Sequence, residues 1–314
     1  MVYLLIFTVT IALLALTALL ISYICYRMAF YVHDKDKKST EEFPIPEGEI
    51  YEPWRDKMVG WMKETRGLPH EKFSITSFDG LELHAKYYQH TPGAPIELMF
   101  HGYRGYAERD LCGGVQRCFA LGHNAFIVDQ RASGDSQGNV ISFGINESKD
   151  CHAWLELMIS HFGPDVKIIL TGISMGASTV LNAAGSPLPK NVIGVLADCG
   201  FTAPAAIIKK VIRDMKLPEN LAYPFVKLGA RLFGRFDLEE ITSIEAVRHC
   251  PVPVIFFHGE EDAYVPCEMS RLNYEVCTSR KKLVTIPDAG HGLSYVVAPE
   301  YYLQQMRNFF YGNK

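Results

Sequence analysis

The segment from residue 166 to 184 constrains the fold more than any other part of this 314-residue chain. The apolar run 166–170 leads into the turn Gly172-Ile173-Ser174-Met175-Gly176, and residues 177–184 have a composition compatible with a helix. A strand, a sharp turn and a helix therefore follow one another. In a G-x-S-x-G turn the serine lies at a strained apex, and the two glycines let neighbouring backbone approach closely. We expect Ser174 to be exposed rather than packed. The five-residue pattern also occurs in flexible loops. A catalytic role for Ser174 therefore requires a base, an orienting acid and an oxyanion hole elsewhere in the chain.

Strand and helix patterns alternate along the chain after an antiparallel start. Residues 73–78 and 81–88 each alternate apolar and polar positions around Asp79-Gly80, which predicts a hairpin. Short apolar runs predict six further strands, at residues 96–100, 125–129, 166–170, 192–197, 252–257 and 283–286. Helical patterns lie between several of them, at residues 109–121, 147–162 and 177–184, and one closes the chain at 299–310. This order predicts an α/β fold whose mostly parallel, eight-stranded sheet has helices on both faces.

Composition narrows the class of protein further. With 48% hydrophobic residues, the chain can bury one large core in a single main domain. A net charge of -4 with mixed signs leaves no basic stripe, which argues against nucleic acid as a partner. The eight cysteines include no C-x-x-C pair, so we interpret them as reduced, mostly buried thiols.

Residues 1–27 are predicted to be a transmembrane anchor. No charged side chain occurs between Met1 and Tyr26, and a helix of roughly 24 residues at about 1.5 Å each crosses a hydrocarbon core of about 30 Å. A cleaved signal peptide is the competing interpretation, but the run is too long and lacks both a basic start and a small-x-small cleavage site. No basic residue precedes the run. Four basic residues follow it: Arg27, Lys35, Lys37 and Lys38. The positive-inside rule therefore predicts a single-pass membrane protein with its catalytic part in the cytoplasm.

Residues 28–70 are predicted to be a tether and a leading helix, and residues 71–314 the catalytic domain. The segment 33–49 is polar and proline-containing, which is typical of a solvated linker, and an amphipathic helix follows near residues 54–65. Within the domain, apolar residues recur at helical spacing in an insertion at about 201–250, which predicts two lid helices. An apolar lid face over the serine would suit an acyl chain, although such a stripe also simply packs a helix onto a core.

Polar residues at the carboxyl ends of the strands are the candidate catalytic groups, because an α/β sheet places its chemistry at that edge. A serine hydroxyl is a poor nucleophile at neutral pH; it needs an imidazole to take its proton and a carboxylate to orient the imidazole. Asp262 follows the strand 252–257, and His291 lies on a glycine-flanked loop after the strand 283–286. The order Ser174, Asp262, His291 supplies nucleophile, acid and base.

Other residues compete for the roles of base and acid. His101 and His258 are rival bases, but each directly precedes a glycine at a strand end, where packing or a turn hydrogen bond is the simpler explanation. Glu260, Glu261 and Asp198 are rival acids. Asp198 also ends a strand, so the choice between it and Asp262 stays open.

A glycine-rich turn after the strand 96–100 is a candidate oxyanion hole. It reads H-G-Y-R-G at residues 101–105, and the backbone N–H of Tyr103 is placed to point at an oxyanion. The N–H of Met175, directly after the serine, is the second candidate donor. Alternatively, H-G-Y-R-G is a tight loop without chemistry.

Taken together, these motifs resemble the α/β-hydrolase superfamily. The motifs are G-I-S-M-G, H-G-Y-R-G, D-Q-R-A-S-G-D-S at residues 129–136, H-G-E-E-D-A-Y-V-P and A-G-H-G. They are most similar to bacterial membrane-tethered serine hydrolases related to prolyl-oligopeptidase-like and acyl-ester hydrolase branches, over about residues 73–310. The resemblance implies an α/β-hydrolase fold with a helical lid, and a triad of Ser174, His291 and Asp262. It also implies that the Tyr103 and Met175 N–H groups form the oxyanion hole, and that residues 129–136 form a structural loop.

The function expected from this set is hydrolysis of carboxylic esters, with acyl or lipid-like substrates, through an acyl-enzyme. A serine peptidase or amidase acting on short peptides is the alternative, because esters and amides pass through the same kind of intermediate. A catalytically inactive hydrolase fold used as a membrane-bound binding module is the second alternative. The expected chemistry needs no metal or cofactor. The expected partners are a small acyl ester or short peptide and the lipid bilayer, and the oligomeric state is left open.

Overall fold

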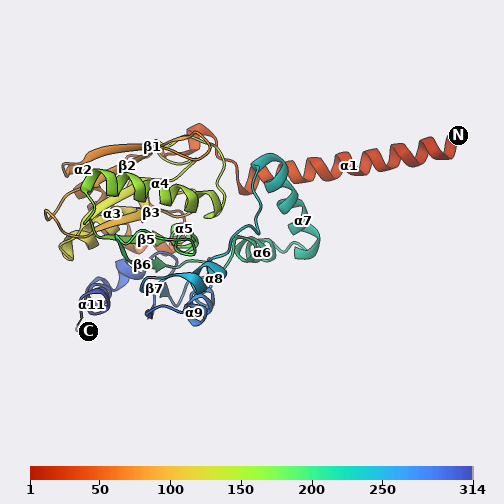
Figure 1. The fold of residues 1–314 in the computed structure, drawn as a ribbon. Helices are drawn as coiled ribbons and strands as arrows, with labels where there is room; N and C mark the ends of the chain where they lie inside the picture. Colours follow the sequence, from red (N-terminus) through yellow and green to blue (C-terminus); the bar gives the residue numbers. More distant parts are fainter. Residues whose placement is uncertain (313–314) are drawn as a thin grey trace.

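An eight-stranded sheet forms the centre of the molecule in the computed structural model, which describes residues 1–312 (Figure 1). The strands are β1 (Glu71–Thr76), β2 (Glu82–Tyr88), β3 (Ile96–Phe100), β4 (Asn124–Asp129), β5 (Ile168–Ile173), β6 (Val192–Asp198), β7 (Val254–Gly259) and β8 (Lys281–Ile286). Their order in the sheet is β1-β2-β4-β3-β5-β6-β7-β8. β2 pairs antiparallel with β1 and β4, and all other neighbours are parallel. The predicted mostly parallel, eight-stranded sheet is confirmed.

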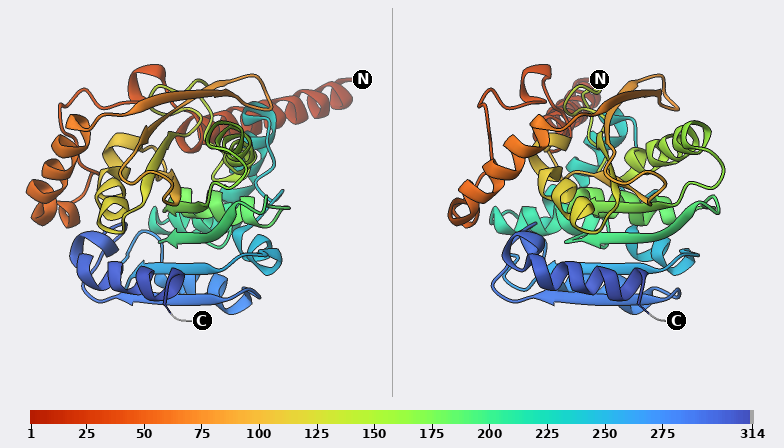
Figure 2. Two further views of the ribbon diagram at one scale, coloured as in Figure 1. Left: turned by 60° about the vertical axis from the view of Figure 1, so that its left-hand side comes forward. Right: turned by 90° about the vertical axis from the view of Figure 1, so that its left-hand side faces the viewer.

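Helices cover both faces of this sheet (Figure 2). Alternate residues of a strand point to opposite faces; along β3, Leu98 and Phe100 pack with Trp154 and Val180, whereas Met99 packs on the other side. The first face carries α4 (Ile145–Phe162), α5 (Met175–Ala184) and α9 (Cys267–Val276). The second carries α2 (Arg55–Gly67), α3 (Ala107–Ala120), α10 (Ser294–Val297) and α11 (Pro299–Phe310).

Helix α1 (Val2–Ala29) projects away from the body (Figure 1). Its most apolar stretch has a mean hydropathy of 2.8 and no buried residues. Its 28 residues, at about 1.5 Å each, extend further than a hydrocarbon core of about 30 Å. By length and composition, α1 can therefore cross a membrane.

Parts of the segment after α1 are packed against the domain. Phe30, Val32, Ile45 and Tyr51 are all buried. Val32 N donates to Asn139 O at 2.9 Å, and the strand-like contact continues on either side of it. The short helices η1 (Asp34–Asp36) and η2 (Glu49–Trp54) lie in the same segment. Most of residues 33–49 is exposed, as expected of a linker, and its two buried residues, Pro44 and Ile45, hold its second half on the domain.

Helices occupy the predicted insertion at 201–250. They are α6 (Pro204–Asp214), α7 (Glu219–Gly229), the π-helical turn η3 (Ala230–Gly234), α8 (Ser243–Ala246) and η4 (Val247–His249). We call residues 204–234 the lid. Ile208, Tyr223 and Val226 of the lid share one apolar cluster with Tyr26 and Phe30 at the end of α1. The lid is therefore packed against α1.

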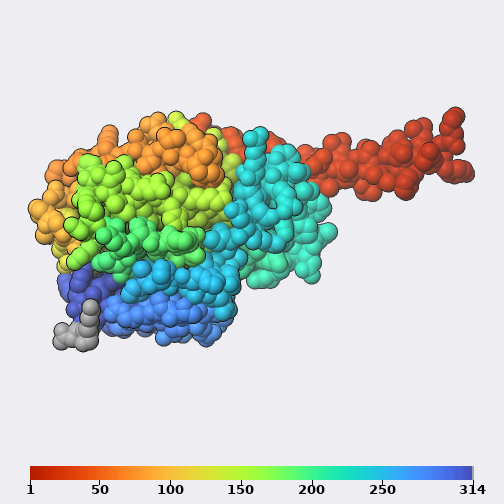
Figure 3. All heavy atoms as spheres, viewed as in Figure 1, coloured from red at the N-terminus to blue at the C-terminus, as the bar shows by residue number. Residues whose placement is uncertain are grey.

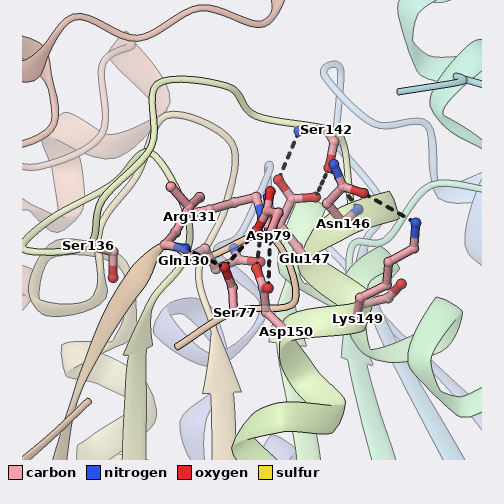
Figure 4. Close-up of polar contacts among 12 residues, drawn as sticks. Ser77, Asp79, Gln130, Arg131, Ser136, Ser142, Asn146, Glu147, Lys149 and Asp150 are labelled. Atoms are coloured by element: carbon pink, nitrogen blue, oxygen red, sulfur yellow. Dashed lines mark hydrogen bonds and ion pairs between the residues drawn. The ribbon is translucent and has the colours of Figure 1, made fainter. Parts of the chain in front are cut away.

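A buried ion-pair cluster connects the β1–β2 turn, the loop after β4 and the start of α4 (Figure 4). Arg131 donates to both carboxylate oxygens of Asp150 at 2.7 Å each and to Asp79 at 2.9 and 3.2 Å. Arg131 and Asp150 are buried, so neither charge has water as an alternative partner. The loop that the sequence assigned a structural role is held in place by this cluster.

Replacing Arg131 should destabilise the fold strongly. Arg131→Met leaves the Asp150 carboxylate buried without its partner, which costs about 3–5 kcal/mol. Chemical unfolding of the full-length protein in detergent micelles measures this cost. Arg55→Met, which removes an ion pair on the surface with Glu52, is the control and should leave the unfolding midpoint unchanged. Equal midpoints for the two variants would contradict the assignment.

Candidate active site

Ser174 lies at a sharp turn between β5 and α5. Its backbone has φ 56° and ψ -119°, a conformation that is strained for a residue with a side chain. A Cβ on Gly172 would lie 2.0 Å from Gly176 O, and one on Gly176 would lie 2.0 Å from Phe100 O. Glycine is therefore required at both positions for the strand and helix to cross this closely.

The turn brings Ser174 to the two residues that follow β7 and β8. Ser174 Oγ lies 2.8 Å from His291 Nε2, and His291 Nδ1 lies 2.7 Å from Asp262 Oδ2. The other oxygen of Asp262 accepts the backbone N–H groups of Tyr264 and Val265 at 2.9 and 2.8 Å. Hydroxyl, imidazole and carboxylate thus form one hydrogen-bonded chain in which the carboxylate is held by its own loop.

Asp262 is kept ionised by its surroundings. Burial opposes its ionisation, but hydrogen bonds from His258 and His291 outweigh this and bring the pKa of Asp262 to about 2. His258 lies behind the acid, where its ring nitrogens contact Ser270 Oγ at 2.7 Å and Val265 O at 2.8 Å. This rival base is therefore a partner of the Asp262 loop and makes no hydrogen bond to Ser174.

The other rival residues also have partners away from Ser174. His101 Nε2 accepts the Gln130 N–H at 3.0 Å, so its Nδ1 carries the proton and donates to Gly102 O at 2.8 Å; burial lowers the pKa of His101. Asp198 accepts hydrogen bonds from Ser294 Oγ at 2.9 Å and Tyr302 OH at 3.1 Å, and His291 is not among its partners. Glu260 and Glu261 are exposed.

The loop at residues 102–105 lies directly against Ser174. A Cβ on Gly102 would lie 3.5 Å from Ser174 Cβ, and Asp110 Oδ2 accepts the Gly102 N–H at 3.1 Å. Burial opposes ionisation of Asp110, but the Arg109 guanidinium outweighs it and lowers the pKa of Asp110. No pattern around Asp110 pointed to this role, because its contact with the loop depends on the packing of α3.

Two backbone N–H groups in this region are suited to an oxyanion. Met175 is the first residue of α5, so its N–H is one of the four at a helix start that have no partner within the helix. Among the described residues, the Tyr103 N–H also has no acceptor. The Met175 N–H is next to Ser174 in sequence, and the Tyr103 N–H belongs to the loop that contacts Ser174.

The same loop is hydrogen-bonded to the end of α1. Tyr103 OH donates to Ala29 O at 2.9 Å, and Arg104 Nη2 donates to Met28 O and Tyr31 O at 3.0 Å each. A cation at the carboxyl end of a helix is favourable for both hydrogen bonding and the helix dipole. The predicted oxyanion loop and α1 are therefore one connected unit.

Ser174 opens onto a cavity of about 550 Å³ that the lid does not line. Ser174 is only 8% exposed, so the expectation of an exposed serine was wrong; the loop at 102–105 and the segment after the anchor cover it. Residues 46–58 supply much of the wall, in the form of Pro46, Glu47, Gly48, Ile50, Tyr51 and Met58. Tyr51 OH also donates to His291 O at 3.0 Å. No lid residue lines this cavity; the apolar stripes of α6 and α7 pack into a buried cluster with α1 and the domain, which is the second of the two expectations for the lid.

Cys199, Asp262 and His291 are the one group whose atoms are close enough to hold a metal ion among residues 1–312, with ligand atoms within 4.8 Å. Burial raises the pKa of the Cys199 thiol well above its usual value, so it stays protonated. Asp262 and His291 are bonded to each other. A protonated thiol and an acid already paired to the imidazole do not fit a metal centre.

The fold and the serine-centred site together define a class of hydrolase, and comparison with known proteins identifies the family. The sequence model of the alpha/beta hydrolase family matches residues 98–305. The chain therefore belongs to the alpha/beta hydrolase family. The resemblance drawn from the motifs is confirmed at this level, and so is the fold class.

Individual relatives agree with this assignment. The YqkD protein of Bacillus subtilis is 26% identical over 60% of this chain, and the match spans 62% of that protein. A lysophosphatidylserine lipase of Danio rerio, ABHD12, is 24% identical over 64% of this chain and 51% of its own length. Among solved structures, the Pyrococcus furiosus esterase Pf2001 superposes with a TM-score of 0.64 at 22% identity, covering 85% of this chain and 95% of that one. The structural likeness shows the fold.

The low pKa of Asp262 predicts an acid-sensitive contribution to stability. Its pKa in the fold, about 2, lies below the value of 3.8 that applies without these contacts. Its stabilisation is therefore present above about pH 4 and lost as the pH falls toward 2. As the pH is lowered from about 4 to 2, we expect the free energy of unfolding of the wild type to fall by about 2 kcal/mol more than that of Asp262→Asn. Unfolding curves at several pH values measure the difference. Glu261→Gln is the control, and an Asp262→Asn curve parallel to the wild type would refute the prediction.

Proposed function

We propose that this chain is a serine hydrolase that cleaves carboxylic esters through an acyl-enzyme intermediate. The observation that carries the proposal is the hydrogen-bonded chain from Ser174 Oγ through His291 to Asp262, with separations of 2.8 and 2.7 Å. In the proposed roles, Ser174 is the nucleophile, His291 the general base and acid, and Asp262 the group that orients His291 and stabilises its cation.

In the proposed reaction, Ser174 Oγ attacks the ester carbonyl while His291 Nε2 takes the hydroxyl proton. The carbonyl oxygen becomes an oxyanion that accepts hydrogen bonds from the Met175 and Tyr103 N–H groups. The tetrahedral intermediate collapses, His291 gives its proton to the departing alkoxide, and the acyl group stays on Ser174. Water then attacks the acyl-enzyme by the same steps, releasing the carboxylic acid and free Ser174.

Several observations favour an ester with an apolar acyl group over a peptide. The cavity at Ser174 has an apolar wall that includes Ile50, Met58 and Ile173. Relatives and structural neighbours include proteins named as a lipase and as esterases. The adjoining helix α1 places the site close to a source of lipid if it crosses a membrane. Acyl or lipid-like esters are therefore the substrates we propose.

We also propose that α1 is a single-pass anchor with the catalytic domain in the cytoplasm. α1 is long and apolar enough to span a membrane. Arg27, Lys35, Lys37 and Lys38 follow its apolar stretch, and the flank that carries Lys and Arg stays on the cytoplasmic side in most membrane proteins. The free state of all eight cysteines is compatible with a reducing compartment.

Removal of the Ser174 hydroxyl should abolish ester hydrolysis. Ser174→Ala is expected to lower kcat by roughly 10⁶-fold, because losing the nucleophile leaves only binding and oxyanion stabilisation. Hydrolysis of a p-nitrophenyl ester by full-length protein in micelles measures the effect. Ser186→Ala, an exposed serine just after the same helix, is the control and should keep full activity. Retained hydrolysis in folded Ser174→Ala would exclude the proposed nucleophile.

The wall formed by residues 46–58 should set the acyl-chain preference. Ile50→Trp adds bulk to the cavity, so kcat/KM across a series of esters should shift toward shorter acyl chains. Leu221→Trp adds the same bulk to the lid, away from the cavity, and should leave the series unchanged. A shift in Leu221→Trp without one in Ile50→Trp would instead place the acyl site under the lid.

Protease protection tests the orientation. Protease added to intact cells should leave the catalytic domain whole, and the same protease should digest it once the membrane is permeabilised. A protein exported by the same cells serves as the positive control for digestion. Loss of the domain in intact cells would place it on the outside.

A further inference from the structure

The last turns of α1 pack tightly on the lid. The rings of Tyr23 and Phe233 lie 5.1 Å apart, and those of Tyr26 and Phe233 lie 5.8 Å apart. A Cβ on Gly229 would lie 2.4 Å from Ser22 O, so α7 approaches the α1 backbone at a position where only glycine fits. The end of α7 and the turn η3 therefore lie at the level of residues 22–26 of α1.

This contact sets the height of the lid relative to any membrane that α1 crosses. A hydrocarbon core of about 30 Å takes up roughly 20 residues of helix. Tyr23 and Tyr26 are residues typical of the membrane interface, and Arg27 is the first charged residue of α1, so Ser22 to Ala29 lie in the headgroup layer. Lid residues beside Ser22 and Tyr23 must lie at the same depth. Phe233 is one of them.

The lid also carries large apolar side chains that are exposed. The exposed large ones form what we call the lid apolar surface: Met215, Leu217, Leu221, Leu232 and Phe233. In Figures 1 and 3 the lid is the part of the body beside which α1 leaves. Leu221 is 63% exposed, and several large apolar side chains exposed on one short segment are typical of an interaction surface.

Basic side chains accompany this surface. Lys216 lies between Met215 and Leu217 at the α6–α7 turn and is exposed, and Arg235 follows η3. Neither forms an ion pair with a carboxylate among the described residues, whereas the neighbouring Arg213 pairs with Glu219. Exposed apolar residues interspersed with free cations are typical of protein surfaces that rest in the headgroup region, where the cations meet lipid phosphates.

We propose that the lid apolar surface is a second membrane contact, seated in the interfacial layer of the bilayer that α1 crosses. Continuity with α1 selects lipid as the occupant, because the packing of Gly229 and Phe233 on Ser22 and Tyr23 brings the η3 end of this surface to the headgroup layer, and the remaining residues of the surface belong to the same lid. Together the two contacts fix the orientation of the domain. Because Lys210 of α6 donates to Ala263 O, next to Asp262, the seated lid also adjoins the candidate active site. This inference rests on the proposed membrane span of α1 and not on the proposed hydrolase activity.

Quenching of tryptophan fluorescence by brominated lipid tests the proposal in full-length protein reconstituted into phosphatidylcholine–phosphatidylglycerol vesicles. Leu217→Trp and Leu221→Trp report on the lid apolar surface, and their emission is taken as the excess over wild type. Leu13→Trp, within α1, is the positive reference. Tyr301→Trp, an exposed aromatic on α11, is the matched control.

The proposal requires that bromine near the glycerol end of the acyl chains causes a loss of the Leu217→Trp and Leu221→Trp emission, while Tyr301→Trp keeps its emission. Quenching of the two lid tryptophans no stronger than that of Tyr301→Trp overturns it. A blue shift of their emission that grows with protein density and is insensitive to bromine assigns the surface to a second copy of the chain, which also overturns it. Unquenched Leu13→Trp would remove the transmembrane premise and the proposal with it.

Discussion

The close crossing of β5 and α5 at Ser174 is the constraint on which the rest of the site depends. The two glycines flanking the turn allow backbone contacts that no side chain would tolerate, and the strained φ of Ser174 lifts its hydroxyl toward the loop after β3. That strain has to be held by the surrounding sheet. The buried core on both faces of β5 supplies the rigidity, so the hydroxyl has one position relative to the strand ends that carry Asp262 and His291.

The N-terminal segment that begins with α1 contacts the site around this turn directly. It is therefore more than a linker between α1 and the domain. Carbonyls at the end of α1 accept hydrogen bonds from Tyr103 and Arg104 in the loop beside Ser174. Further along, Tyr51 lines the cavity and donates to the backbone of His291. The end of α1 and the candidate active site are therefore connected by direct contacts. In the proposed function, the position of the anchor would bear on both the oxyanion donors and the base.

The strands and the three residues Ser174, Asp262 and His291 could be predicted from the sequence. Apolar runs mark the strands, and residues just after parallel strands meet at one edge of a sheet, so Ser174, Asp262 and His291 could be expected together. Asp198 satisfied the same rule, and only the packing of Ser294 and Tyr302 around it separates the two acids. The wall at residues 46–58 and the burial of Phe30 could not be foreseen. Both depend on contacts between distant segments, and local polarity pointed to solvent instead.

The central claim is that Ser174 is the nucleophile of this site, and mapping a covalent adduct tests it most directly. Full-length protein is treated with a fluorophosphonate, digested, and the modified residue located by mass spectrometry. The account predicts one stoichiometric adduct, on Ser174, that does not form in His291→Ala. An adduct on another residue, or folded wild-type protein that forms none, would contradict it.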